Sequence, residues 1–221
     1  MKDRPSEAAA LGNLGNAFVD VGETQRGLQH FKQALLIDRE VGDRRGEANA
    51  LGNLGLAYAQ MGESQRAIQY FEQALLIDHE IGDHRGETNA LGSLGLVYAY
   101  RGETKRAIQF FEQQLTIVSE IGDRRGESIA LGNLGNAYAD LDETEHAIQL
   151  YKRALLIDRE IGDHRSEASD LWNMSLALDK LGKRASATQY AEQSLTIFEQ
   201  IEDPLAARVR AQLAEWREES G

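Results

Sequence analysis

The segment Ala50–Gly62 recurs along the chain at one fixed spacing. Close copies begin at Ala10, Ala90 and Ala130, and a diverged copy begins at Asp170, so consecutive copies are 40 residues apart. Self-similarity at a period of 20 to 50 residues is typical of repeat proteins, in which each unit packs only on its neighbours. The sequence therefore predicts a linear array of short helical units rather than a domain with one central core.

The first half of each copy is predicted to form a helix. In the second copy this helix runs from Arg44 to Gln60, preceded by Asp43 as N-cap, since a carboxylate accepts hydrogen bonds from the free N–H groups of the first turn. Gly62 follows as the residue that ends a helix in the left-handed conformation. The apolar residues that recur at helical spacing, and so predict one buried stripe, are Leu51, Leu54 and Tyr58.

The second half of each copy is predicted to form another helix. In the second copy we expect Ser64 to cap it and Ile81 to be its last residue. Gly55 lies inside the first helix, where glycine costs about 1 kcal/mol against alanine, so we expect close helix contact opposite the small Ala67. The linkers are short and predict antiparallel neighbours. The expected buried side consists of Ala67, Ile68, Phe71, Ala74, Leu75 and Ile81.

The spacing predicts five repeats, at about 3–42, 43–82, 83–122, 123–162 and 163–203. A last helix within 204–221 begins after Pro204, and its apolar edge consists of Leu205, Val209, Leu213 and Trp216. Because the last unit of an array needs cover for its apolar end, we interpret this helix as a cap. The chain opens at a repeat boundary, which fits either a short natural array or a piece of a longer protein.

Charge and composition exclude several classes of function. A net charge of −12 disfavours binding to nucleic acid or to an anionic membrane surface. There is no cysteine, the segment Met1–Glu7 is polar, and no apolar run approaches the ~20 residues that span a bilayer, so we expect a cytoplasmic protein. We find no phosphate-binding loop, no nucleophile–base set and no metal-ligand spacing among the five histidines. The sequence predicts no catalytic residue, metal or cofactor.

The recurring pattern resembles the signature of the tetratricopeptide repeat (TPR). In the second copy it consists of Leu51, Leu54, Gly55, Tyr58, Gly62, Ala67, Phe71 and Ala74. Leucine replaces the usual leading tryptophan and the usual closing proline is absent, so the repeat is longer than the common form of about 34 residues. This form is similar to the Pins/LGN adaptors, to kinesin light chains and to bacterial TPR arrays, some of them attached to regulatory ATPases. The resemblance implies an all-α, right-handed α-solenoid of five TPR hairpins plus the capping helix.

The resemblance also implies that the first helices line a concave groove. Asparagines recur on the corresponding face, and an amide can both donate to and accept from a peptide backbone. We expect this face to hold an extended or helical peptide segment, unless the amides bond within or between repeats. The candidate groove residues are Asn13, Asn16, Asn49, Asn53, Gln60, Asn89, Ser93, Tyr100, Asn133, Asn136 and Asn173.

Three neighbouring features have alternative interpretations. The glycines at 12, 52, 92 and 132 provide either close approach for a ligand or close packing of helices. Arg45 and its equivalents are expected to form exposed ion pairs rather than a basic binding line. The carboxylate clamp of chaperone-type TPR proteins is not expected, because its cationic positions correspond to Gly12, Asn89 and Ser93.

The sequence thus favours a noncatalytic scaffold that binds a peptide segment of another protein. One alternative is a structural role with self-association, by end stacking or by groove contacts. Another is a sensor segment of a larger signalling ATPase or transcription regulator. Any ATPase activity would have to lie outside these residues, because they contain no phosphate-binding loop.

Overall fold

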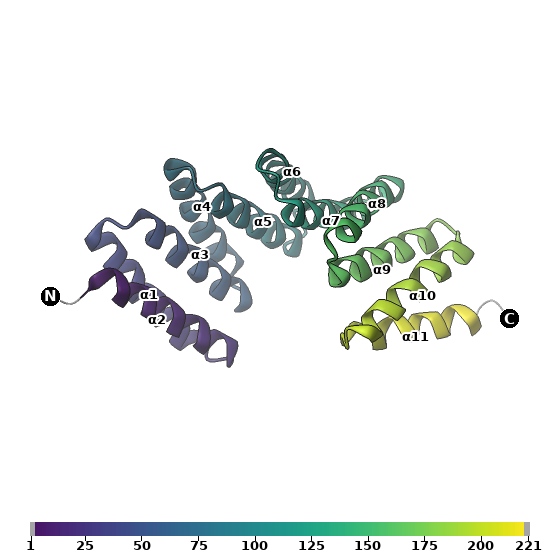
Figure 1. Ribbon diagram of the computed structural model, residues 1–221, viewed down its shortest axis with the longest axis horizontal. Coiled ribbons are helices and arrows are strands. Elements are labelled where there is room, and N and C mark those ends of the chain that lie inside the picture. Colours follow the sequence, from purple (N-terminus) through teal and green to yellow (C-terminus); the bar gives the residue numbers. More distant parts are fainter. Residues whose placement is uncertain (1–2, 219–221) are drawn as a thin grey trace. The chain divides into compact units, whose positions relative to one another are not determined.

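A computed structural model describes residues 3–218, in which every regular element is a helix (Figure 1). They are α1 (Arg4–Asp20), α2 (Thr24–Val41), α3 (Arg44–Gln60), α4 (Ser64–Ile81), α5 (His84–Tyr100), α6 (Thr104–Glu120), α7 (Arg124–Asp140), α8 (Thr144–Ile161), α9 (His164–Lys180), α10 (Arg184–Gln200) and α11 (Leu205–Glu218). The helices form consecutive antiparallel pairs, and the predicted all-α class is confirmed.

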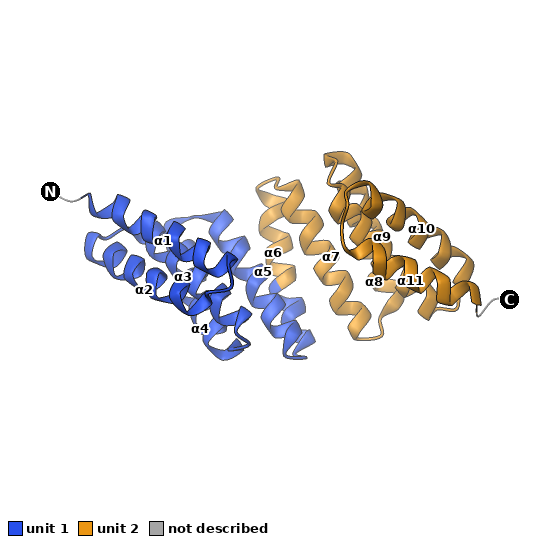
Figure 2. Ribbon diagram, turned by 90° about the horizontal axis from the view of Figure 1, so that it is seen from below, with its two compact units in different colours: residues 1–110 blue, residues 111–221 orange. Residues whose placement is uncertain are grey.

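The chain divides into two compact units, residues 1–110 and 111–221, which Figure 2 colours separately. In the first unit α1 packs on α2 and α3 on α4, while α2 and α4 each contact the first helix of the following pair. The first helices α1, α3 and α5 are also direct neighbours along one side of the unit. Its core includes the fully buried Phe31, Leu51, Leu54, Phe71 and Leu94.

The predicted caps of the first helices are confirmed. The carboxylates of Asp43 and Asp83 accept from the backbone N–H groups of Gly46 and Gly86 at 2.9 and 3.2 Å. Gly62 has a φ of 75°, which is why glycine is favoured at this turn. The aspartate caps set where α3 and α5 begin, and the left-handed Gly62 sets where α3 ends.

Two expectations for the second helix are wrong. Glu63, not Ser64, occupies the N-cap position of α4, and no side-chain hydrogen bond caps this end. Ile81 is 40% exposed at the last residue of α4, whereas Ile77 and Asp78, one turn earlier, are buried against the neighbouring helices. The helix is anchored by the turn before its end, so its final apolar residue faces solvent.

The in-helix glycines make room for an aromatic ring rather than only for a small residue. A Cβ atom at Gly55 would lie 2.6 Å from the ring of Phe71, and one at Gly15 would lie 2.5 Å from that of Phe31. The small residues do face each other in the first pair, where a Cβ at Gly27 would lie 2.8 Å from the carbonyl oxygen of Gly15. The expected contact opposite Gly55 therefore comes mainly from Phe71.

In the second unit α7 packs on α8, α8 on α9, and α9 on α10, while α11 covers the end. The buried side of α11 consists of Ala206, Val209, Leu213 and Trp216, which join one core cluster with α9 and α10. The rings of Trp172 and Trp216 lie 6.5 Å apart. Trp172 replaces the glycine of the earlier repeats. Its large ring packs where α11 covers the last helix pair.

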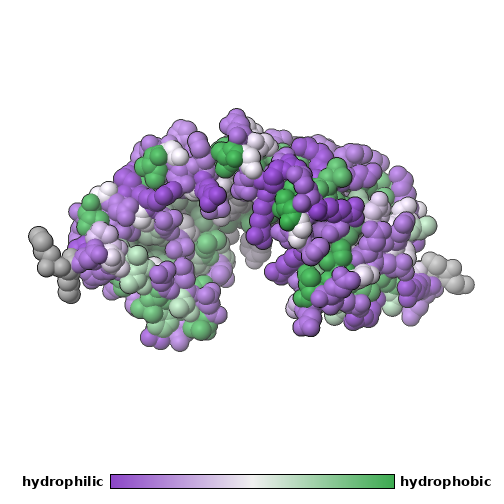
Figure 3. All heavy atoms as spheres, viewed as in Figure 1, coloured by the Kyte–Doolittle hydropathy of each residue, from purple (hydrophilic) through white to green (hydrophobic). Residues whose placement is uncertain are grey.

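Hydrophilic residues dominate the face drawn in Figure 3, and hydrophobic ones appear there as separate patches. None of the helices that the structure describes is both long and apolar enough to cross a membrane.

Candidate functional site

In the described part of the chain, three of the hollows lie between one first helix and the next. Hollow 1, of about 420 Å³, lies between α1 and α3, and hollow 2, of about 290 Å³, lies between α3 and α5. Residues of α2 and α4 form their floors. Hollow 3, of about 280 Å³, belongs to the second unit and lies between α7 and α9. Each hollow is thus built by one first helix and the next.

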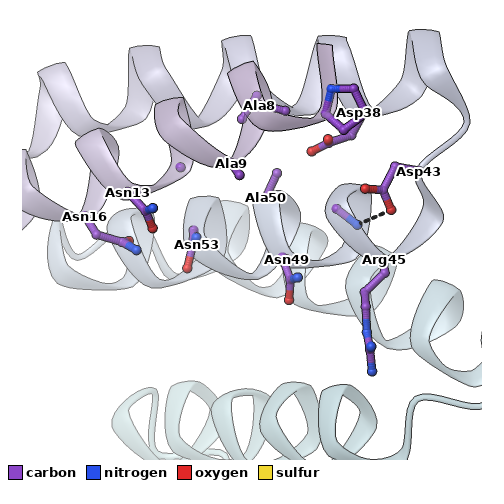
Figure 4. A pocket seen from close by; sticks show the side chains of 14 residues that line it. Ala8, Ala9, Asn13, Asn16, Asp38, Asp43, Arg45, Asn49, Ala50 and Asn53 are labelled. Carbon is purple, nitrogen blue, oxygen red and sulfur yellow. Dashed lines mark hydrogen bonds between the residues drawn. The ribbon is translucent and has the colours of Figure 1, made fainter. Parts of the chain in front are cut away.

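The structure brings most of the candidate groove residues to these hollows. Hollow 1 is lined by Asn13, Asn16, Asn49 and Asn53, hollow 2 by Asn49, Asn53, Asn89 and Ser93, and hollow 3 by Asn133, Asn136 and Asn173. Figure 4 shows the amides of α1 and α3 side by side at hollow 1. Gln60 and the 82% exposed Tyr100 line none of the three hollows.

One of these amides is satisfied internally. The Oδ1 atom of Asn136 accepts a hydrogen bond of 2.8 Å from the hydroxyl of Tyr151. Within residues 3–218, the other asparagine side chains of the hollows have no hydrogen bond to the protein, and each is at least partly exposed. The interpretation of bonding within a repeat therefore holds for Asn136 alone.

Two buried carboxylates on the hollow floors are a feature that the sequence analysis missed. Asp38 lines hollow 1 and is 5% exposed, and Asp78 lines hollow 2 and is 6% exposed. Each carboxylate occupies the space left by a glycine, because a Cβ at Gly46 would lie 2.7 Å from Asp38 and one at Gly86 would clash with Asp78. An acidic residue inside the apolar stripe of a second helix was the signal that could have revealed them.

Burial changes the proton affinity of these groups. It raises the pKa of Asp78 to about 6, and the nearby Asp83 and Glu87 act in the same direction. The pKa of Asp38 is raised by burial and then by Asp43 and Glu47. No side-chain or backbone donor among the described residues reaches either carboxylate.

The second unit satisfies its equivalent carboxylate differently. Asp158 is fully buried and accepts from the hydroxyl of Ser128, and it is also hydrogen-bonded to Asp170, which lines hollow 3. Burial and the neighbouring Asp158 raise the pKa of Asp170 to about 8, so Asp170 holds the proton of the pair near neutral pH. The neighbours of this carboxylate therefore come from the chain itself.

Two exposed leucines are a second feature that was missed. Leu56 is 51% exposed and lines hollow 2, and Leu96, at the equivalent position of α5, is 54% exposed. Both lie off the buried stripe of their helix, and this displacement was a readable signal. The corresponding residues of α1 and α7 are Asn16 and Asn136.

The glycines at the hollows behave in two ways. A Cβ at Gly12 or Gly52 would meet nothing within 4 Å, so close helix packing does not explain these two. At Gly132 the carboxylate of Asp170 takes that space, 3.0 Å away.

In the ion pairs around the hollows, an exposed arginine contacts a largely buried carboxylate. Arg45 pairs with Asp83 at 2.6 Å, and the equivalent Arg165 pairs with Asp203 at 3.0 Å. Glu47 is held at 2.7 Å by both Arg39 and Arg44. In the described part of the chain, no group of three or more metal-binding side chains is positioned to hold an ion.

The tetratricopeptide repeat family matches this chain over residues 6–78, 86–160 and 126–200. No curated protein matches it. Among solved structures, a Podosopora anserina putative kinesin light chain with nearly identical TPR-like repeats is similar at 18% identity and a TM-score of 0.75, covering 91% of this chain and 99% of that one. BtubC (BKLC) from P. vanneervenii is similar at 16% identity and a TM-score of 0.81, covering 90% and 82%.

A third similar structure is a Signal Transduction ATPase with Numerous Domains from Pyrococcus horikoshii that has a TPR sensor. It matches at 19% identity and a TM-score of 0.86, over 99% of this chain but only 34% of that protein. The present chain therefore spans about a third of this relative. At these identities the three likenesses show the fold.

Proposed function

Because the chain belongs to the tetratricopeptide repeat family, we propose that it is a noncatalytic scaffold whose hollows bind a peptide segment of another protein. TPR repeats are in general protein–protein interaction modules. The proposal treats residues 3–203 as five 40-residue repeats and 204–221 as their cap. It places the ligand along the first helices, at hollows 1 and 2 in the first unit and at hollow 3 in the second.

The observation that carries the proposal is the row of unbonded amides. Asn49 and Asn53 line both hollows of the first unit and have no side-chain partner in the described protein. A primary amide offers two donors and an acceptor, which is what a peptide backbone requires. The open surface at Gly12 and Gly52 leaves room for a backbone to lie close to the helices.

Geometry sets the scale of the ligand. Packed helices are about 8–10 Å apart, and an extended peptide advances about 3.3 Å per residue, so each repeat holds about three ligand residues. A segment of roughly fifteen residues would then match five repeats. The exposed Leu56 and Leu96 provide apolar contacts between the polar ones.

We would test the proposal with a phage-displayed library of random 15-residue peptides, selected on the immobilised full chain. Selected peptides are then labelled and titrated by fluorescence anisotropy. Replacing Asn49 and Asn53 together by alanine should weaken binding by about tenfold or more, since each lost hydrogen bond contributes about 1 kcal/mol. The matched control replaces Gln29 and Gln149, two exposed amides on second helices, and should change affinity less than about twofold. An empty selection, or equal affinity of both variants, would refute the proposal.

The likeness to a protein with a TPR sensor supports a second candidate, a sensor segment of a larger signalling protein. In that case the groove would be the sensing surface, and the same peptide experiment applies to it.

A further inference from the structure

We propose that Asp38 and Asp78 each bind a lysine or arginine side chain of the peptide segment held by the hollows. This inference rests on the proposed function and names the chemistry that the groove selects. Asp38 would take one basic side chain in hollow 1 and Asp78 another in hollow 2.

The two carboxylates lack the donors that buried carboxylates normally have. Both are at least nine-tenths buried, both face a hollow, and no donor of the described protein reaches them. Figure 4 shows Asp38 among the side chains that line hollow 1. An unpaired carboxylate is costly to bury, so a partner entering through the hollow would be stabilising. The equivalent Asp158 differs, because Ser128 and Asp170 of the chain itself lie against its carboxylate.

The surroundings favour a cation as that partner. The nearest charged groups that act on Asp38 are Asp43 and Glu47, and both are acidic. Asp83 and Glu87 act on Asp78 in the same way, and Arg45, the cation that opposes them there, is already paired with Asp83. An ammonium or guanidinium group forms a stronger, charge-assisted hydrogen bond with a carboxylate than a neutral donor does.

The apolar lining of the hollows suits the aliphatic part of a lysine or arginine side chain. Hollow 1 contains Ala8, Ala34 and Ala50 beside Asp38. Hollow 2 contains Phe71 and Ala74 beside Asp78. Lysine and arginine bury their aliphatic stems against apolar surface while the charged head reaches a polar group. The hollows therefore combine an apolar passage with a carboxylate at its end.

The repeat spacing predicts how the basic residues are arranged in the ligand. Asp38 and Asp78 occupy the same position in consecutive repeats. With about three ligand residues per repeat, their partners should be about three positions apart in an extended segment. The third copy has Val118 at this position, so no third basic residue is expected to follow.

The test uses the same random peptide library and the full chain. Selected peptides should be enriched in pairs of basic residues about three positions apart. The variant Asp38→Asn/Asp78→Asn should bind these peptides at least tenfold more weakly. The charge-matched control is Glu72→Gln/Glu145→Gln, which changes two exposed carboxylates on α4 and α8 and should change affinity less than twofold.

A second arm changes the peptide. Replacing its two basic residues by norleucine should weaken binding to the wild-type chain at least tenfold, and the remaining affinity should no longer respond to Asp38→Asn/Asp78→Asn. Peptides that bind through Asn49 and Asn53 without basic residues, and with no effect of the aspartate changes, would overturn this inference and leave the proposed function standing. An empty selection would overturn both.

Discussion

The buried pair of Asp158 and Asp170 makes a sharp prediction about stability and pH. The positions equivalent to Asp170 in the earlier repeats, 50, 90 and 130, are all alanine. The carboxyl of Asp170 is hydrogen-bonded to Asp158. The folded chain holds a proton there that the unfolded chain releases near the ordinary pKa of 3.8. This contribution to stability is complete below that value and is lost as pH rises through about 8.

The magnitude follows from the two pKa values. With about 8 in the folded chain and 3.8 in the unfolded chain, proton binding at Asp170 stabilises the fold by about 4 kcal/mol at pH 5 and by no more than about 1 kcal/mol at pH 8. In Asp170→Asn the amide donates to Asp158 without a titrating proton. We therefore expect the difference in the free energy of unfolding, wild type minus variant, to fall by roughly 3–4 kcal/mol from pH 5 to pH 8.

The assay is urea unfolding followed by circular dichroism at pH 5, 6.5 and 8, with both chains at equal ionic strength. All other titrating groups are shared, so the difference between the curves isolates the pair. Asp20→Asn, which removes an exposed carboxylate on α1, is the charge control and should follow the wild type. Parallel pH profiles of the wild type and Asp170→Asn would refute the assignment of the proton to this pair.

Two further predictions concern packing, and both are measured by urea unfolding. Gly55→Ala should lower the free energy of unfolding by about 1 kcal/mol, because crowding against the ring of Phe71 exceeds the gain in helix propensity. Gly52→Ala, where a Cβ meets nothing within 4 Å, should raise it by about 0.5–1 kcal/mol, and equal effects at both sites would contradict the packing account. Trp216→Ala should cost about 3–5 kcal/mol, because this buried ring ties α11 to the last pair; a cost below about 1 kcal/mol would argue against a capping role.

The helices themselves were predictable because their signals are local. The bounds Arg44–Gln60 agree with the structure, since Asp43 and Gly62 act within one turn of the helix ends. Ser64 was misplaced because a hydroxyl residue fits the first helical position as well as the cap, and the backbone decided for Glu63.

The face that carries the asparagines was also predictable, because helical periodicity separates it from the buried stripe of Leu51 and Leu54. Its depth was not. Gln60 and Tyr100 share the periodicity but line none of the three hollows.

The sequence by itself determined the repeat, the helix pairs, the caps of the first helices and the polar face, because each depends on residues within a few turns of one another. Only the tertiary structure decided that Asp38 and Asp78 are buried without donors, that Asp170 shares a proton with Asp158, and that Gly52 is open. These properties depend on distances between side chains of different helices. A one-dimensional pattern places residues on a face, but the packing of that face determines their burial, their partners and their charge.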